Sequence, residues 1–484
     1  MESPKQQLTT LAAQKNTKIV ATVGPACNNY NALLELAKAG VNVFRLNFSH
    51  GDHDGHRKVI EYITYINEKY GFHIGILADL QGPKLRVGMM ENDGLLVEEG
   101  DIITFVNEDC IGTKDHVYMS YKEFAKDVKA GEKVLLDDGK LVFEVVETDG
   151  ISQVKMRVIY GGILKNKKGV NLPETKTSLP CLTPKDLADL EFVLTQPVNW
   201  IALSFVRRPE DIHDLRQRLN SAKHPALICA KIEKPEAVEN LDAIIKASNA
   251  VMVARGDLGV EFPIEKLPMV QKTIVEKCIQ RARPVIVATQ MMESMIENPS
   301  PTRAEVLDVA NAVMDGADAV MLSAETAAGK FPVETVNAMT RIICEIEKLP
   351  ARHERPHLYK TSGVFINDVV CLNAARMSVE VNAKAIIGFT SSGYTAFKVS
   401  SYRPHAKIFI FSPREEMLGT LNLVRGVKCF FYDKLTSTDE TIEDTIQILK
   451  ETDNLVSGDI VINTGSMPIE KKLRTNMLKV SIVD

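Results

Sequence analysis

The 484-residue sequence has no long apolar segment: no uninterrupted apolar run approaches the 18 residues that a membrane-spanning helix needs. Residues 1–14 are polar and contain no apolar signal core, which argues against secretion. The eight cysteines are scattered without a CxxC spacing, so neither a zinc ribbon nor a disulfide framework is expected. Cys229, Cys278 and Cys344 lie in apolar stretches and are expected to be reduced core residues. These absences predict a cytoplasmic protein that does not contact a membrane.

An excess of basic residues is also missing. The formal net charge is −5, from 58 Lys and Arg against 63 Asp and Glu, so no nucleic-acid partner is expected. The composition, 45% hydrophobic and 25% charged, is ordinary for a globular protein, and the length predicts two to four domains.

The sequence does contain an alternation of short apolar runs and amphipathic stretches. Continuous apolar strands separated by amphipathic helices indicate a parallel sheet that is covered by helices. Eight strand candidates with seven helices between them, and an eighth helix after Pro332, predict an α/β fold of the (β/α)8 TIM-barrel type. The expected strands cover residues 18–23, 41–46, 74–78, 200–203, 227–230, 251–254, 285–288 and 319–322.

Polar residues cluster where these expected strands end, which is where barrel enzymes place their catalytic groups. Two neighbouring ends are especially informative, because Lys231-Ile-Glu233 and Arg255-Gly-Asp257 each follow an apolar run. Glu233 and Asp257 offer the hard oxygen ligands that Mg²⁺ prefers, and Lys231 supplies a fixed positive charge. A buried salt bridge explains the first triplet alone equally well, but recurrence at six ends favours an active site. The polar residues at the six ends are Arg45, Asn47, Ser49, Asp79, Lys231, Glu233, Arg255, Asp257, Thr289, Gln290, Ser323 and Glu325.

The predicted barrel is interrupted and flanked by other segments. Residues 1–17 form an N-terminal segment, and the barrel is divided into residues 18–86 and 178–349. Between them, residues 87–177 have short β-type runs with dense Gly and Asp turn signals, which predicts an inserted all-β barrel or sandwich domain acting as a lid. Its basic stretch at residues 165–168 is compatible with a phosphate contact or with a solvated loop.

Residues 350–484 are predicted to form a separate C-terminal α/β domain, because a charged, proline-bearing linker at 350–356 precedes new strand-like runs. Its stretch from Thr390 to Thr395 lies between an expected strand and helix. The hydroxyls and amides there fit an anion site, or alternatively an ordinary helix-capping loop.

Several motifs together resemble the pyruvate kinase family over almost the whole chain. They are Arg45-Leu-Asn-Phe-Ser-His-Gly51, Lys167-Lys-Gly-Val-Asn-Leu-Pro173, Cys229-Ala-Lys-Ile-Glu233, Met252-Val-Ala-Arg-Gly-Asp-Leu-Gly259, Ala288-Thr-Gln-Met-Met-Glu-Ser-Met295, Pro301-Thr-Arg-Ala-Glu305, Asp308-Val-Ala-Asn-Ala-Val313 and Met321-Leu-Ser-Ala-Glu-Thr326. The resemblance implies the three-domain architecture predicted above. It also implies phosphoryl transfer from phosphoenolpyruvate to ADP, giving pyruvate and ATP in glycolysis, by a homotetramer.

The resemblance further implies residue roles. Lys231, Arg45, Thr289, Ser323 and Glu325 match catalytic positions, and Arg45, Lys231, Gly256, Asp257 and Thr289 match positions that bind phosphoenolpyruvate. Glu233 and Asp257 match the ligands of Mg²⁺ or Mn²⁺. The nucleotide positions correspond to Asn47, His50, Arg86 and Lys168, and a monovalent-cation site corresponds to Asn47, Ser49, Asp79 and the carbonyl of Leu80.

Two departures from the family pattern concern cofactors and regulation. Lys84 stands where K⁺-requiring members have Glu, which predicts an enzyme that works without K⁺; the alternative is that Lys84 only pairs with a local carboxylate. Thr390, Ser391, Ser392, Gly393 and Thr395 match the loop that holds a sugar-phosphate effector, so a phosphorylated effector is expected. The later segment lacks the Trp and Arg pattern of members that respond to fructose 1,6-bisphosphate, and its Lys471, Lys472 and Arg474 fit a phosphate site or a solvated loop.

Two other classes of protein were weighed. A Mg²⁺-dependent barrel lyase that acts through a pyruvate enolate would have similar rim residues but no need of a nucleotide site. A non-catalytic scaffold or RNA-binding protein would have lost the rim charges or gained a basic face, and the sequence has neither feature.

Overall fold

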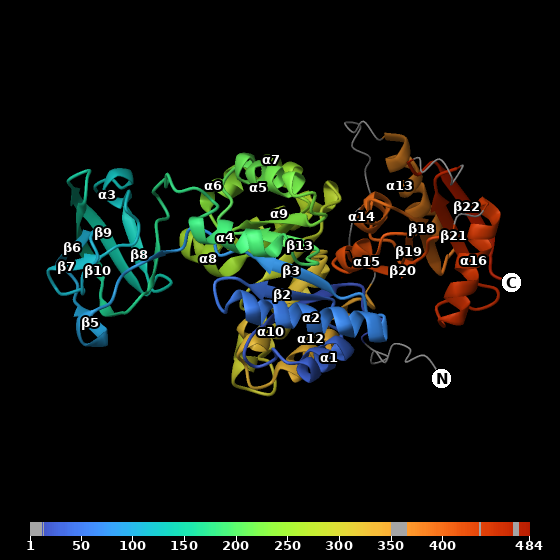
Figure 1. Ribbon diagram of the computed structural model, residues 1–484, viewed down its shortest axis with the longest axis horizontal. Helices are drawn as coiled ribbons and strands as arrows, with labels where there is room; N and C mark the ends of the chain where they lie inside the picture. Colours follow the sequence, from blue (N-terminus) through green and yellow to red (C-terminus); the bar gives the residue numbers. More distant parts are fainter. Residues whose placement is uncertain (1–11, 13, 350–364, 435–436, 468–473) are drawn as a thin grey trace.

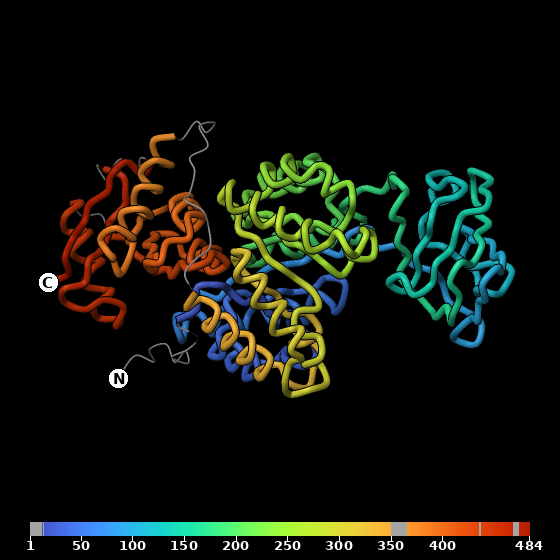
Figure 2. Tube along the Cα trace, turned by 180° about the vertical axis from the view of Figure 1, so that it is seen from behind, coloured from blue at the N-terminus to red at the C-terminus, as the bar shows by residue number. Residues whose placement is uncertain are grey.

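A computed structural model of the chain describes residue 12 and residues 14–349, 365–434, 437–467 and 474–484. Three bodies lie in a row, with the β-rich lid at one end, the barrel in the middle and the C-terminal α/β domain at the other end (Figure 1). The view from behind shows the same order (Figure 2). Lys471 and Lys472, the two lysines of the possible phosphate site, lie outside the described residues.

The central body is the predicted (β/α)8 barrel. Within residues 14–349, eight parallel strands close in the order β1-β17-β16-β15-β14-β13-β3-β2. Their side chains are almost entirely buried, because the strands are covered by helices outside and packed against each other inside. The strands are β1 (Lys18–Val23), β2 (Val43–Asn47), β3 (Gly75–Asp79), β13 (Trp200–Leu203), β14 (Leu227–Ile232), β15 (Ala250–Ala254), β16 (Val285–Ala288) and β17 (Ala319–Leu322).

The covering helices follow the predicted alternation, with two short additional helices, α8 (Arg255–Glu261) and α11 (Ala324–Ala327), and one divided helix. The helix expected from Pro235 to Ala247 is divided at Asn240, whose backbone leaves the helical range at φ −94° and ψ 15°. The helices of the barrel are α1 (Tyr30–Ala39), α2 (His53–Tyr70), α4 (Pro184–Val193), α5 (Pro209–Ser221), α6 (Pro235–Glu239), α7 (Leu241–Ala247), α8 (Arg255–Glu261), α9 (Leu267–Gln280), α10 (Arg303–Met314), α11 (Ala324–Ala327) and α12 (Pro332–Ile346).

The lid is an all-β domain with its own hydrophobic core. A seven-stranded sheet has the order β4-β12-β8-β9-β10-β6-β7, and a bridge between Val87 and Met119 joins the ends of its two edge strands. Leu85 and Arg86 pair with Val170 and Gly169, so the lid's pairing begins two residues before the expected boundary. The lid elements are β4 (Leu85–Arg86), β5 (Gly94–Val97), β6 (Ile102–Val106), β7 (His116–Tyr118), α3 (Phe124–Asp127), β8 (Lys133–Leu136), β9 (Leu141–Thr148), β10 (Gln153–Tyr160), β11 (Gly162–Lys165) and β12 (Gly169–Asn171).

The C-terminal domain is an open α/β sheet. In its described residues, five strands lie in the order β20-β19-β18-β21-β22, parallel except for the edge strand β22. The elements are α13 (Phe365–Glu380), β18 (Ala385–Phe389), α14 (Tyr394–Ser401), β19 (Lys407–Ser412), α15 (Glu415–Leu421), β20 (Val427–Phe431), α16 (Thr438–Glu451), β21 (Ile460–Gly465) and β22 (Met477–Ile482).

This domain packs against the end of the barrel where the strands begin. The indole of Trp200, the first residue of β13, donates to the carbonyl of Thr420 at 3.1 Å. Gly75 at the start of β3 approaches Gly419 so closely that a Cβ on Gly75 would lie 2.5 Å from the Gly419 carbonyl oxygen. The opposite end, where the strands terminate, faces the lid. No helix in the described part of the chain combines the length and apolarity needed to cross a membrane.

Candidate active site

The ends of β2, β3 and β14 bring a row of charged side chains together. The Arg45 Nε atom lies 2.6 Å from Oδ2 of Asp79, whose Oδ1 lies 3.2 Å from the Lys231 ammonium. Lys231 also contacts Glu233 Oε1 at 3.0 Å. Charges of opposite sign therefore alternate along this part of the rim.

The buried position of this row determines its protonation. Burial raises the pKa of Asp79, but Lys231 and Arg45 outweigh it, so the pKa lies below its usual range. Burial lowers the pKa of Lys231, but Asp79 and Glu233 outweigh it, so that pKa lies above its usual range. Both groups are therefore held in their charged forms, which gives the rim a fixed positive charge at Lys231.

Glu233 and Asp257 are the two carboxylates expected to hold a divalent cation. Burial raises the pKa of Glu233, and the neighbouring charge of Asp257 raises it further. This repulsion fits a divalent cation, because an ion between the two carboxylates would remove it. No group of three or more His, Cys, Asp or Glu side chains in the described residues could hold a metal. Two carboxylates nevertheless suit Mg²⁺, which takes its other oxygen ligands from water and substrate.

Lys84 stands beside this pair. Its ammonium lies 3.5 Å from Oδ1 of Asp257, and the two side chains are 33% and 29% exposed. The local pairing considered for Lys84 is thus present, and its partner is one of the expected metal ligands.

Thr289 occupies an unusual backbone position at the end of β16. Thr289 and Gln290 both have positive φ, of 70° and 53°, a region that costs energy for a β-branched residue such as threonine. The Thr289 hydroxyl accepts a hydrogen bond from the Gly256 amide at 2.8 Å, and the Thr289 carbonyl accepts one from Arg255 at 2.6 Å. Arg255 itself is paired with Asp308 at 2.7 Å. These contacts join the end of β16 to the start of α8, so the Gly256 amide expected to receive a substrate carboxylate donates here to Thr289.

Other expected residues lie apart from this row. Glu325 is 2% exposed, and its two oxygens accept hydrogen bonds from the amides of Met292 and Ser323, so it braces two loops. Arg86 donates to the Lys167 carbonyl within the lid, and Lys168 pairs with Asp137 of the lid at 2.8 Å. The nucleotide residues of the lid are therefore engaged with the lid itself.

The residues of the expected monovalent-cation site also have partners. Asn47 Oδ1 accepts from the Ser49 amide at 3.2 Å, and the Leu80 carbonyl accepts from the Ser204 hydroxyl at 2.7 Å. Asp79 holds Arg45 and Lys231, as described above. The exposed His50 lies beside them, where its carbonyl contacts the His56 ring at 3.1 Å.

Ser204 is a contributor that the sequence did not reveal. It directly follows β13, and its hydroxyl accepts a hydrogen bond from the Lys231 ammonium at 2.7 Å. The next amide, that of Phe205, donates to Glu233 Oε2 at 2.7 Å. The position of Ser204 after an apolar strand could have indicated a site residue. It was missed because a serine carries no charge.

A cavity of about 590 Å³ lies at the ends of β18 and β19, and it is lined by Thr390, Ser391, Ser392, Tyr394 and Thr395. The Thr390 hydroxyl accepts from the Gly393 amide at 2.9 Å, and the Thr395 hydroxyl lies 2.7 Å from that of Thr475. Asp433, Lys434 and Arg474 also line this cavity, and Lys434 pairs with Asp444 at 2.8 Å, so hydroxyls and charges of both signs surround one space. The N-cap of α14 is Gly393, which has no side chain to cap the helix, so the Thr390 contact closes the loop that precedes the helix.

A closed (β/α)8 barrel with a charged rim, an inserted β lid and a C-terminal α/β domain defines a three-domain barrel enzyme. Family models of the pyruvate kinase barrel domain and the pyruvate kinase alpha/beta domain match residues 14–336 and 368–481. A pyruvate kinase of Corynebacterium glutamicum is 41% identical over 97% of this chain and 98% of its own length. Pyruvate kinase 2 of Synechocystis is 42% identical over 97% of this chain and 79% of its own length.

A solved structure is similar as well. The crystal structure of a pyruvate kinase from Cryptosporidium parvum has a TM-score of 0.92 and 34% identity, with 98% of each chain covered. The chain belongs to the pyruvate kinase family and is a phosphotransferase. The barrel-lyase alternative finds no support among these relatives.

Proposed function

We propose that this chain transfers the phosphoryl group of phosphoenolpyruvate to a terminal phosphate oxygen of ADP, giving ATP and, after protonation of the enolate carbon, pyruvate. The observation that carries the proposal is the buried Lys231 ammonium, which is held between Asp79 and Glu233 at 3.2 and 3.0 Å. In the transfer, the bond between phosphorus and the enol oxygen breaks, and a bond between phosphorus and an ADP oxygen forms. A fixed cation at this point stabilises the charge on the moving phosphoryl group and on the enolate.

The neighbouring residues have positioning roles in the proposal. Arg45 binds phosphate oxygens through its planar guanidinium, and Asp79 fixes its direction at 2.6 Å. Thr289 places its hydroxyl beside the start of α8, where the substrate carboxylate is proposed to lie. Glu233 and Asp257 would hold Mg²⁺ or Mn²⁺, which supplies a counter-charge for the substrate oxygens when it is bound. We propose Ser323, together with the loop that Glu325 braces, for the proton path to the enolate carbon.

The nucleotide is proposed to lie between the rim and the lid. Asn47 and His50 are on the barrel side, whereas Arg86 and Lys168 are on the lid side. Because Lys168 is paired with Asp137 in this structure, it must exchange that partner for a nucleotide phosphate when the lid closes.

A coupled assay of pyruvate formation tests the function. We expect pyruvate to form only when phosphoenolpyruvate, ADP and Mg²⁺ are all present. Lys231→Met should lower kcat by about 10³-fold, because it removes the central charge. Lys246→Met, on the exposed surface of α7, is the matched control and should be neutral. Pyruvate release that continues without ADP would refute the proposal.

We also propose that the enzyme does not require K⁺. The rim holds three cations and three anions, so its formal charge is 3 − 3 = 0. The cations are Arg45, Lys231 and Lys84, and the anions are Asp79, Glu233 and Asp257. Lys84 thus supplies the charge that a monovalent cation would bring. The test is activity in a buffer whose only monovalent cation is tetramethylammonium, where a many-fold rise on adding KCl would overturn the proposal.

The cavity at Thr390–Thr395 is proposed to bind a phosphorylated effector, since its hydroxyls face the cationic Lys434 and Arg474. Activity at subsaturating phosphoenolpyruvate, measured across a panel of sugar phosphates and AMP, should change with at least one compound. Ser392→Ala should weaken that response, and a flat response throughout would remove the proposal.

The active form is proposed to be a cytoplasmic homotetramer. The edge strand β22 leaves Val480 and Ile482 42% and 68% exposed, which provides an apolar edge for a second copy of the chain. Light scattering should give four times the 53.6 kDa chain mass, and a monomeric mass at assay concentration would contradict this.

A further inference from the structure

A second large cavity lies at the opposite end of the barrel from Lys231. It has a volume of about 530 Å³ and is enclosed by the barrel on one side and the C-terminal domain on the other. Lys15 and Lys18 line it from the barrel, and Lys384, Lys407 and Lys428 line it from the C-terminal domain. Five lysines from two domains thus face one space.

Four of these lysines donate to uncharged oxygens. The Lys18 ammonium donates to the Val427 carbonyl at 2.7 Å, and that of Lys407 donates to the Gln14 carbonyl at 2.6 Å. Lys15 and Lys428 donate to the side-chain amides of Asn42 and Asn454. Among the described residues, none of the five lysines forms an ion pair. This differs from the catalytic rim, where every cation has a carboxylate partner.

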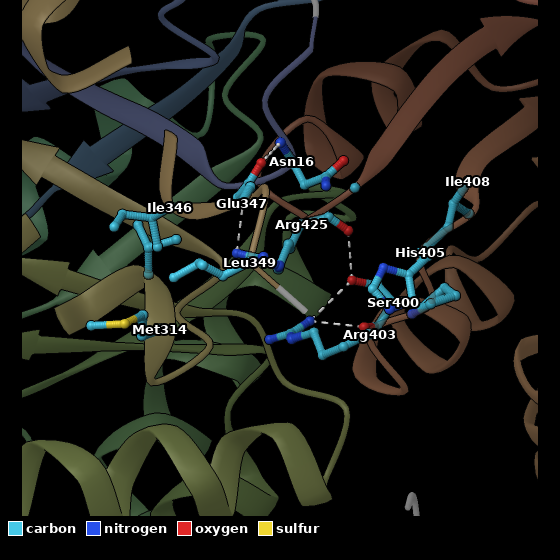
Figure 3. A pocket seen from close by; sticks show the side chains of 13 residues that line it. Asn16, Met314, Ile346, Glu347, Leu349, Ser400, Arg403, His405, Ile408 and Arg425 are labelled. Atoms are coloured by element: carbon cyan, nitrogen blue, oxygen red, sulfur yellow. Dashed lines mark hydrogen bonds and ion pairs between the residues drawn. The ribbon is translucent and has the colours of Figure 1, made fainter. Parts of the chain in front are cut away.

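The acidic residues nearby do not balance the five charges. Asp453 is the one acidic residue among the described residues that line the cavity, which leaves 5 − 1 = +4. Glu347 is close enough to act on the lysines, but its carboxylate accepts from the Asn16 and Thr17 amides at 2.6 and 2.7 Å and pairs with Arg425 at 3.2 Å. Figure 3 shows Glu347 directed toward Asn16 in the neighbouring pocket.

Burial, together with repulsion between neighbouring lysines, lowers the pKa values of four of these lysines. Burial, with the charge of Lys18 added to it, lowers the pKa of Lys15 well below its usual value. Burial lowers the pKa of Lys18 to about 8, and the charge of Lys407 adds to the effect. Burial also lowers the pKa values of Lys407 and Lys428. A bound anion would reverse these shifts, because it would supply the missing negative charge.

We propose that this cavity binds a small organic polyanion with phosphate groups, held by lysines of both the barrel and the C-terminal domain. The volume falls in the range of small-molecule sites. Lysine suits phosphate as a compact point charge, and several lysines suit a ligand with more than one negative group. Because the lysines come from two domains, the ligand ties the C-terminal domain to the strand-start end of the barrel. The site is separate from the hydroxyl-lined cavity at Thr390–Thr395.

Calorimetric titration of the full-length chain tests the proposal, with sodium sulfate and fructose 1,6-bisphosphate as probes. We expect at least one probe to bind with uptake of protons at about pH 8.5, because Lys18 regains its proton beside an anion. Comparing two buffers of different ionisation enthalpy measures this uptake.

Charge-removing variants locate the binding. Lys428→Gln and Lys384→Gln should each weaken the bound probe about tenfold, since each removes one charged contact. Lys246→Gln on α7 removes a lysine elsewhere and should leave the affinity unchanged. Ser392→Ala, in the other cavity, should leave sulfate binding unchanged.

Three results would overturn the proposal. One is the absence of binding of either probe to the wild type up to about 10 mM. Another is an affinity that Lys428→Gln and Lys384→Gln do not lower, or lower no more than Lys246→Gln does. The third is complete loss of binding in Ser392→Ala, which would assign the anion to the hydroxyl-lined cavity. Melting temperatures without anion identify a misfolded variant, because removal of a cation that forms no ion pair should not lower them.

Discussion

On the proposal that Lys84 replaces K⁺, changing Lys84 to methionine should make the activity dependent on K⁺. The substitution keeps most of the side-chain length and removes the charge. The formal charge of the six rim residues therefore falls from 0 to −1. Asp257 then loses the cation that lies 3.5 Å from its Oδ1 atom. The negative charge left at the rim opposes the approach of an anionic substrate, unless a monovalent cation from solution replaces the lysine.

The distance between the Lys84 ammonium and Asp257 sets the size of the expected loss of activity. Two unit charges 3.5 Å apart interact by about 1 kcal/mol in a water-like dielectric and about 5 kcal/mol at an effective dielectric of about 20. Because the two side chains are 33% and 29% exposed, solvent screening favours the lower part of this range, about 2 kcal/mol. A loss of about 2 kcal/mol corresponds to a decrease of about 30-fold in kcat/KM.

The assay compares three proteins in tetramethylammonium buffer and then with KCl added. The wild type should be active in both buffers, whereas Lys84→Met should lose about 30-fold without K⁺ and recover most of it with KCl. Lys176→Met is the matched control, since Lys176 is exposed near the lid connection and the described residues give it no ion pair. A Lys84→Met enzyme that keeps full activity without K⁺, or one that K⁺ does not rescue, would refute the charge-balance reasoning.

Three other predictions concern a positioning residue, a domain contact and pH. Ser204→Ala removes the 2.7 Å contact to Lys231 and should lower kcat about tenfold with little change in unfolding free energy; an unchanged kcat would exclude a positioning role. Asp318 and Arg403 form a buried ion pair, 2.9 Å apart, where the barrel contacts the C-terminal domain (Figure 3 shows Arg403). Asp318→Asn breaks this pair and should lower the free energy of unfolding, measured by chemical denaturation, by about 3–5 kcal/mol. A loss below about 1 kcal/mol would contradict this. The pKa of Lys18 is about 8 in the folded chain and about 10.5 in the unfolded chain. Between these two pH values the unfolded chain therefore binds more protons than the folded chain does. Its contribution to stability should therefore rise between about pH 8 and 10, and Lys18→Met should remove that rise in denaturation curves; identical pH profiles would contradict the assignment.

The barrel could be predicted from the sequence because its strands are continuous apolar runs, which reflects burial on both faces. Local composition fixes this pattern, and the strand boundaries agree with the structure to within a few residues. The division of the expected 235–247 helix at Asn240 could not be predicted in the same way, since the apolar spacing continues across it. Which backbone angle one asparagine adopts depends on its neighbours in the fold.

The charged members of the site could be predicted for a similar reason, because charges directly after buried strands are uncommon without a function. Ser204 carries no charge, so this criterion did not select it. Its hydrogen bond with Lys231 identifies it as part of the site. Contacts between residues that lie far apart in the sequence were beyond sequence reasoning as well. Nothing local in the sequence shows that Lys168 pairs with Asp137, or that Lys18 and Lys428 line one cavity.

The two ends of the barrel differ in how their charges are arranged, and the difference indicates what each end binds. At the rim, cations and carboxylates are equal in number, which suits a site where a divalent cation and an anionic substrate arrive together and largely neutralise each other. At the strand-start end, five lysines face one carboxylate, that of Asp453, which leaves a formal charge of +4. A metal ion would worsen that imbalance and an uncharged ligand would leave it in place. An anion would lower the electrostatic energy of that cavity, so the same charge count that motivates the proposal for Lys84 at one end favours a negatively charged ligand at the other.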